Sequence, residues 1–392
     1  MPSHPTRFRT CLCLATAAYL ALCWFATGSA SQPRLNDPEI QPYLVPEFQY
    51  LGNASCSGTE CHTADKAAAH SGQMIGDEAN IWAEADPHAL AYETLASTES
   101  KKIATALTLS SAAQSDRCLS CHAMNPPPAQ RGEKFSLVNA VGCEACHGPA
   151  QKWLEPHKAA GWTLSQRNSI GADGLLKQFG LVDTSNLHSR STTCVSCHLR
   201  IDKDMIDAGH PPLEFEQYAY DYYVSKKPDR EYRQHWGEGI DPPTYWDAKL
   251  WAAGQFAACD ASAAQVAEWK SKGWDTADAE SLAAIYSGGV AVAKKCLGVE
   301  NAKAVIDAQL TPAKAAAAAV ELAAMAPSVK NQIQRRILTN GVAALTSSAY
   351  DEAGKELPDA FWDSYDAALE ASDAATFKTH LDAMAAIAGE IK

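Results

Sequence analysis

The amino-acid sequence predicts a mainly α-helical protein that ends in an antiparallel helical bundle. From about Tyr245 the chain is rich in alanine and forms amphipathic segments separated by breaks such as Thr311-Pro312 and Leu357-Pro358-Asp359. Short connections favour antiparallel neighbours, and small alanine faces let helices pack closely. The expected helices span residues 246–258, 261–272, 277–295, 302–310, 312–326, 328–348, 360–371 and 374–391.

The first 30 residues have the features of a Sec-type signal peptide. Arg7 and Arg9 precede an apolar run over residues 11–25, and small residues lie before an expected cleavage after Ala30. The run is shorter than the roughly 20 apolar residues of a membrane span, so an uncleaved membrane anchor is the weaker alternative. We therefore expect export to the periplasm, with a Pro-rich arm over residues 31–50.

Length and charge limit the classes of function. A chain of 392 residues is long enough for roughly two or three domains. Its formal net charge of -13 argues against nucleic-acid binding and favours redox partners with basic docking surfaces.

Eight cysteines lie in four motifs of the kind that attaches haem c. Thiols three residues apart in a helix lie about one turn apart, so both can reach the vinyl groups on one edge of a porphyrin, while the following histidine binds the iron. A zinc site needs no histidine after every second cysteine, so zinc is the weaker alternative. We therefore expect four covalently attached haem c groups. The motifs are Cys118–Cys121–His122, Cys143–Cys146–His147, Cys194–Cys197–His198 and, with two extra residues between its cysteines, Cys56–Cys61–His62.

Two further cysteines are expected to form a disulfide. The sequence has 13 cysteines, of which three lie in the expected signal peptide and eight in the haem motifs, so that Cys259 and Cys296 remain. Exported proteins commonly pair such cysteines, and two buried thiols are the alternative.

Three histidines outside the motifs lie in contexts suited to the second axial position of a haem iron. His88 follows an expected helix N-cap and a proline, and His157 ends a short segment bracketed by prolines. His210 lies between a glycine, which permits close approach to a flat ring, and two prolines. Three candidates for four irons leave one iron that could be open. The less well marked histidines are His70, His188 and His235, and His380 is expected at the surface.

These features together resemble the tetrahaem cytochrome c-554 family. The resemblance rests on the order of the motifs and on Asp86-Pro87-His88-Ala89-Leu90-Ala91-Tyr92, Cys143-Glu144-Ala145-Cys146-His147-Gly148-Pro149 and Ala208-Gly209-His210-Pro211-Pro212, and it covers about residues 52–251. It implies a mostly helical domain with little regular sheet, wrapped around haems in close pairs. It also implies electron transfer in the periplasm.

The resemblance further implies a ligand set. The first haem would be held by His62 and His157, the third by His147 and His210, and the fourth by His198 and His88. The second haem, on His122, would be five-coordinate. An exchange of the third and fourth pairings is the alternative. Because no haem motif follows residue 245 and alanine-rich helical segments begin near it, we expect a tetrahaem domain over residues 51–248 and a helical domain over residues 249–392.

Three functions fit these expectations. The first is a periplasmic electron carrier, which we favour. The second is a redox enzyme for a small nitrogen oxide at an open iron on His122, where Arg131 and Lys134 could attract an anion. The third is a docking or structural subunit of a respiratory assembly, with the C-terminal bundle as its contact surface.

Overall fold

The computed structural model describes residues 47–58, 61–63, 78–220 and 243–392. Within these ranges the chain is mainly α-helical and has no sheet, and its isolated bridge joins Tyr50 and Arg131. The prediction of a mainly α-helical chain with little regular sheet is therefore confirmed. The expected signal peptide, most of the Pro-rich arm, His70 and His235 lie outside the described residues.

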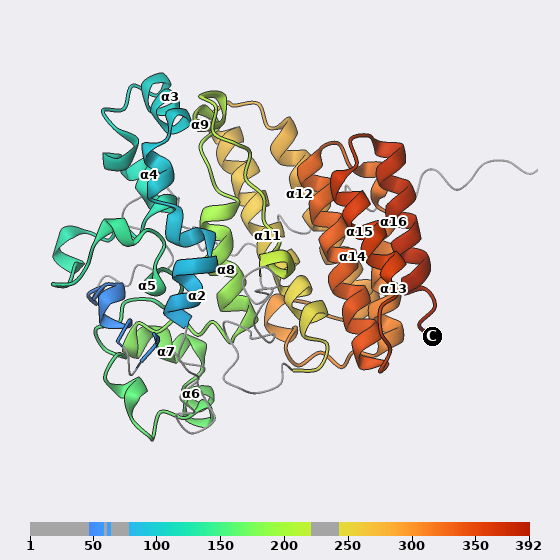
Figure 1. Ribbon diagram of the computed structural model, residues 1–392, viewed down its shortest axis with the longest axis horizontal. Coiled ribbons are helices and arrows are strands. Elements are labelled where there is room, and N and C mark those ends of the chain that lie inside the picture. Colours follow the sequence, from blue (N-terminus) through green and yellow to red (C-terminus); the bar gives the residue numbers. More distant parts are fainter. Residues whose placement is uncertain (1–46, 59–60, 64–77, 221–242) are drawn as a thin grey trace, which may run out of the picture.

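The first half of the chain consists of short helices joined by turns (Figure 1). Its buried apolar clusters are small, and one of them contains only Tyr50, Met124 and Ala145 as buried members. The helices are α2 (Glu78–Ala85), α3 (Thr98–Ala106), α4 (Asp116–His122), α5 (Cys143–His147), α6 (Leu164–Ile170), α7 (Ala172–Phe179), α8 (Leu187–His198) and α9 (Lys203–Asp207).

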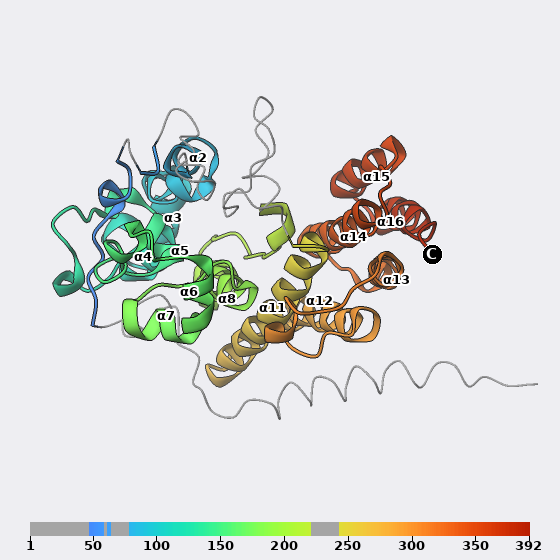
Figure 2. The same cartoon turned by 90° about the horizontal axis from the view of Figure 1, so that it is seen from below.

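The second half is a bundle of longer helices, seen end-on in part in Figure 2. Sequential pairs of these helices pack against each other, as short connections predict. Local sequence explains their starts: the Thr311 hydroxyl accepts a hydrogen bond from the amide of Lys314, and Pro312 takes the first helical position. No helix in the described ranges combines the length and apolar character needed to cross a bilayer. The helices are α11 (Trp246–Ser271), α12 (Ala277–Val292), α13 (Pro312–Ala323), α14 (Gln332–Glu352), α15 (Asp359–Glu370) and α16 (Ala374–Ala388).

Two segments of the bundle differ from the expectation. Residues 246–271 form one continuous helix, because neither proline nor glycine lies at the expected break near residue 260. The segment 302–310 contains only a 3₁₀ turn, Ala302–Ala304, since so short a helix is marginal without extensive packing.

The bundle shares a hydrophobic core with α8. In both views α8 lies beside α11 (Figures 1 and 2). Leu187 and Val195 of α8 are buried in the same cluster as Leu250 and Trp251 of α11. Full burial of one leucine contributes about 1.5–3 kcal/mol, so this contact is a substantial part of the fold. The expected domain boundary between residues 248 and 249 falls inside α11.

Candidate haem sites

The three closely spaced motifs each lie on a helix that ends at the motif histidine. Helices α4, α5 and α8 end at His122, His147 and His198, so the two thiols of each motif lie about one turn apart. In the wider motif, the amide of Cys61 donates to the carbonyl of Gly58 at 2.8 Å, a turn that shortens the path between the cysteines. Residues 59 and 60 of this motif are outside the described ranges.

Three pairs of histidines lie at the separation expected for two rings that share a single iron. A metal–imidazole nitrogen bond is about 2.0 Å long, so two rings on opposite sides of one iron have centres roughly 6 Å apart. Each pair joins a motif histidine to one of the predicted distal histidines. The ring-centre distances are 6.4 Å for His62–His157, 5.9 Å for His88–His198 and 6.2 Å for His122–His210.

All six of these rings are oriented by a hydrogen bond at Nδ1. Their acceptors are carboxylates or backbone carbonyls, which have no proton to give, so Nδ1 carries the hydrogen and Nε2 keeps its lone pair. Metal-binding histidines usually have such a partner. The acceptors are Glu78 for His62, Asp86 for His88, and the carbonyls of Ala91, Leu154, Glu214 and Pro211 for His122, His157, His198 and His210.

The electrostatic surroundings differ between the rings. Burial by itself lowers the pKa of His62 and His88, but the hydrogen-bonded carboxylates of Glu78 and Asp86 outweigh it, so both pKa values are raised. Burial of His198, together with the charge of His88, lowers the pKa of His198 to about 4. A low pKa favours the neutral imidazole, which is the form that binds a metal.

The position of His210 differs from the one that the family resemblance implies. That resemblance pairs His210 with His147 and leaves the iron on His122 open. In the structure Gly209, at φ 106°, reverses the chain after α9, and the amide of His210 donates to the carbonyl of Met205 at 2.9 Å. This turn places the His210 ring beside His122. An exchange of the third and fourth pairings does not describe the arrangement either, because His88 faces His198.

The other described histidines lie elsewhere. His188 is in the first turn of α8, and its buried Nδ1 has no hydrogen-bond partner among the residues that the structure describes. It therefore lacks the orienting contact that the six paired rings share. His380 lies on α16 of the bundle.

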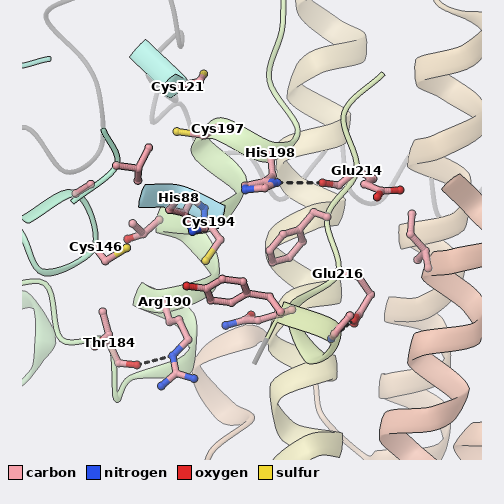
Figure 3. Close-up of a pocket in the computed structure, with 18 of the residues that line it drawn as sticks. His88, Cys121, Cys146, Thr184, Arg190, Cys194, Cys197, His198, Glu214 and Glu216 are labelled. Atoms are coloured by element: carbon pink, nitrogen blue, oxygen red, sulfur yellow. Dashed lines mark hydrogen bonds between the residues drawn. The ribbon is translucent and has the colours of Figure 1, made fainter. Parts of the chain in front are cut away.

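A cavity of about 310 Å³ lies beside the fourth motif (Figure 3). Tyr220 donates a hydrogen bond to Asp86 at 2.7 Å, and Asp86 in turn holds Nδ1 of His88 at 2.8 Å. These two hydrogen bonds fix the angle of the His88 ring. The thiols of Cys194 and Cys197 and the imidazoles of His198 and His88 line this space. Its other walls are largely apolar, as at Phe215, so the space fits a covalently bound haem.

The four motifs contact one another in a definite order. A hydrogen bond with Cys143 raises the pKa of the Cys56 thiol, and one with Cys121 lowers the pKa of Cys197 to about 7. Cys146 lines the same cavity as Cys197. In space the motifs therefore follow one another as first, third, fourth and second.

Sequence reasoning missed Glu144, the second residue of the third motif. Its side chain is fully buried, and its carboxylate accepts hydrogen bonds from the amides of Leu51, Gly52 and Ala150 at 2.8, 2.6 and 2.7 Å. The third motif is thus tied to the chain just before the first. Nothing in the local sequence distinguishes this residue from an exposed spacer.

The expected disulfide between Cys259 and Cys296 stays a prediction. Both residues belong to one hydrophobic cluster of the bundle, Cys259 as a buried member and Cys296 as a partly buried one. Cys259 is buried in α11, whereas Cys296 directly follows α12. Burial and, to a smaller extent, the carboxylate of Glu321 on α13 raise the pKa of Cys296.

Helical motifs, oriented histidine pairs and a cavity lined by thiols and imidazoles define a multihaem c-type cytochrome, a class of electron carriers. Residues 55–148 match the family described as "Cytochrome c554 and c-prime", and this segment of the chain belongs to that family. The match contains the first three motifs and ends before the fourth motif and the bundle. No curated protein and no solved structure matches the chain.

Proposed function

We propose that this chain is a periplasmic tetrahaem cytochrome that passes electrons between redox partners. The observation that carries the proposal is the set of three histidine pairs, each about 6 Å apart and each joined to an attachment motif. Bound haem c supplies one-electron chemistry at its iron. The contribution of the chain is to hold and orient the ligands.

The residues around the pairs support a fixed coordination. Each imidazole of a pair is oriented at Nδ1, so the two residues of a pair would hold a haem iron with little freedom to rearrange when the charge of the metal changes. The order of the motifs also supports a relay, because motif-to-motif contacts join the third motif to both the first and the fourth. Electron transfer along a series of haems requires closely spaced iron centres.

The placement of His210 argues against the enzyme that we considered as an alternative. That reading needs an open iron on His122, and the structure places a second imidazole 6.2 Å from the His122 ring. Arg131 also has other contacts: its guanidinium donates to Asn125 and to the carbonyl of Pro126, both at 2.9 Å. The net charge of -13 supports partners with basic docking surfaces.

The proposal is tested by purifying the exported protein and measuring its haem content. A haem-stained gel, intact mass and N-terminal sequencing should show four covalent haems on a chain that begins at Ser31. A mass that fits three haems would show that Cys56 and Cys61 do not attach one. Electron paramagnetic resonance should show low-spin iron for the three histidine pairs. A chain without haem after export would refute the proposed function.

A further inference from the structure

The cavity beside the fourth motif is completed by the C-terminal bundle. Three residues of α14, Arg336, Ile337 and Asn340, line it together with Cys197 and other residues of that motif. The family match ends at residue 148, so this wall belongs to a part of the chain outside the matched segment. The bundle is therefore placed to act on a cofactor, beyond any structural or docking role.

Arg336 brings a positive charge to this wall. Its Nε lies 2.9 Å from Oε2 of Glu214, and its Nη2 lies 2.5 Å from the same oxygen. Both side chains are 41% exposed, so this ion pair by itself contributes little to folding stability. A guanidinium has five N–H groups, and the bond to one oxygen uses only part of this capacity.

Haem chemistry predicts where a cation is needed. The propionates of haem lie on the edge opposite to the vinyl groups that cysteines attach. In Figure 3, Cys197 and Glu214 lie on opposite sides of His198. The wall near Glu214 and Arg336 is therefore the one that would face a propionate, and a planar guanidinium fork matches a carboxylate well.

The other arginine at the cavity has different contacts. Nε of Arg190 donates to the carbonyl of Thr184 at 2.7 Å, and its guanidinium lies over the ring of Trp246, 5.2 Å from the centre. These contacts hold Arg190 at the end of the cavity near Thr184, away from Glu214 (Figure 3).

We propose that Arg336 of the C-terminal bundle binds a propionate of the fourth haem and raises the reduction potential of that haem. The proposal rests on the proposed function, since it requires a haem on Cys194 and Cys197. A nearby cation favours the reduced state, which carries one positive charge fewer than the oxidised state. Glu214 holds the guanidinium in place and opposes part of its charge.

The experiment compares variants of the full haem-loaded protein by potentiometric titration, with haem content and circular dichroism measured for each. Arg336→Gln should lower the midpoint potential of one haem. The reduction equilibrium should shift on the order of tenfold for a charge at this range, which is about 59 mV for one electron. Arg336→Lys keeps the charge and should restore most of the shift. Lys295→Gln is the matched control, because it removes one cation from an exposed ion pair with Glu321, on the bundle and outside the residues that line the cavity.

A second variant keeps the proposal testable if Arg336→Gln does not fold. Glu214→Gln removes a negative charge from the same wall and should raise the potential of the same haem. If Arg336→Gln loads four haems and its potentials equal those of Lys295→Gln, the proposal is overturned. If Arg336→Gln does not fold, an unchanged or lowered potential in Glu214→Gln overturns it. A wild-type protein without haem would instead refute the proposed function itself.

Discussion

Replacement of Tyr286 by phenylalanine should weaken the attachment of the bundle to the segment beside the fourth motif. Tyr286 of α12 is fully buried, and its hydroxyl bonds both backbone polar groups of Phe215: it accepts from the amide at 3.2 Å and donates to the carbonyl at 2.9 Å. The ring centre of Phe215 lies 6.4 Å from that of His198. Each buried backbone group that loses its partner costs about 1–3 kcal/mol, so for two groups we expect a loss of about 2–6 kcal/mol in the free energy of unfolding.

The measurement is urea unfolding of the haem-loaded protein, followed by circular dichroism and by visible absorbance. Tyr350→Phe is the matched control, since the Tyr350 hydroxyl donates to the carbonyl of Ile387 at 3.0 Å near the end of the bundle. That variant should lose about 1 kcal/mol in the free energy of unfolding. If Tyr286→Phe is no less stable than Tyr350→Phe, the two hydrogen bonds to Phe215 do not hold the site as we argue.

Three further predictions concern the motifs and the cavity. Glu144→Gln places an amide where three backbone amides need acceptors, and should cost about 1.5–3 kcal/mol in urea unfolding; unchanged stability would contradict the role of this carboxylate. Burial raises the pKa of Glu216 from 4.5 to about 7, so the folded state binds its proton more tightly than the unfolded state. The contribution of Glu216 to stability should therefore be fully present below about pH 4.5 and fall by about 3 kcal/mol as the pH rises through about 7. Glu216→Gln should remove this part of the slope, and a slope equal to that of the wild type would show that another group titrates. His210→Ala should produce a new high-spin signal and cyanide binding at one iron, whereas His188→Ala should not; two identical spectra would refute the pairing with His122.

The local geometry of the motifs could be predicted from the sequence because that geometry depends on spacing along a helix. A helical turn between two cysteines and a following histidine is fixed by the backbone, and so is the cap formed by Asp86, whose carboxylate accepts from the amide of His88 at 3.0 Å. The mainly α-helical bundle followed for the same reason, since alanine-rich segments and proline breaks act locally.

Long-range placement could not be predicted in the same way. Whether His210 reaches His122 or His147 depends on the turn at Gly209 and on how α9 packs, and neither is encoded in the spacing of histidines. The disulfide between Cys259 and Cys296 was expected from counting cysteines, and it stays a prediction. The contribution of α14 to the cavity wall was not expected, because Arg336 resembles any surface arginine in a helical segment.

The histidine pairs also constrain how the chain can fold. Each of the three pairs joins residues that are far apart in sequence: His62 with His157, His88 with His198, and His122 with His210. A chain made from its N-terminus presents Cys56 and Cys61 well before the residue that completes their site. Contacts of such high contact order form late, because loop closure must come first. We therefore expect haem attachment to take place on an extended chain, and the second imidazole of each pair to arrive only as the whole protein folds around its cofactors.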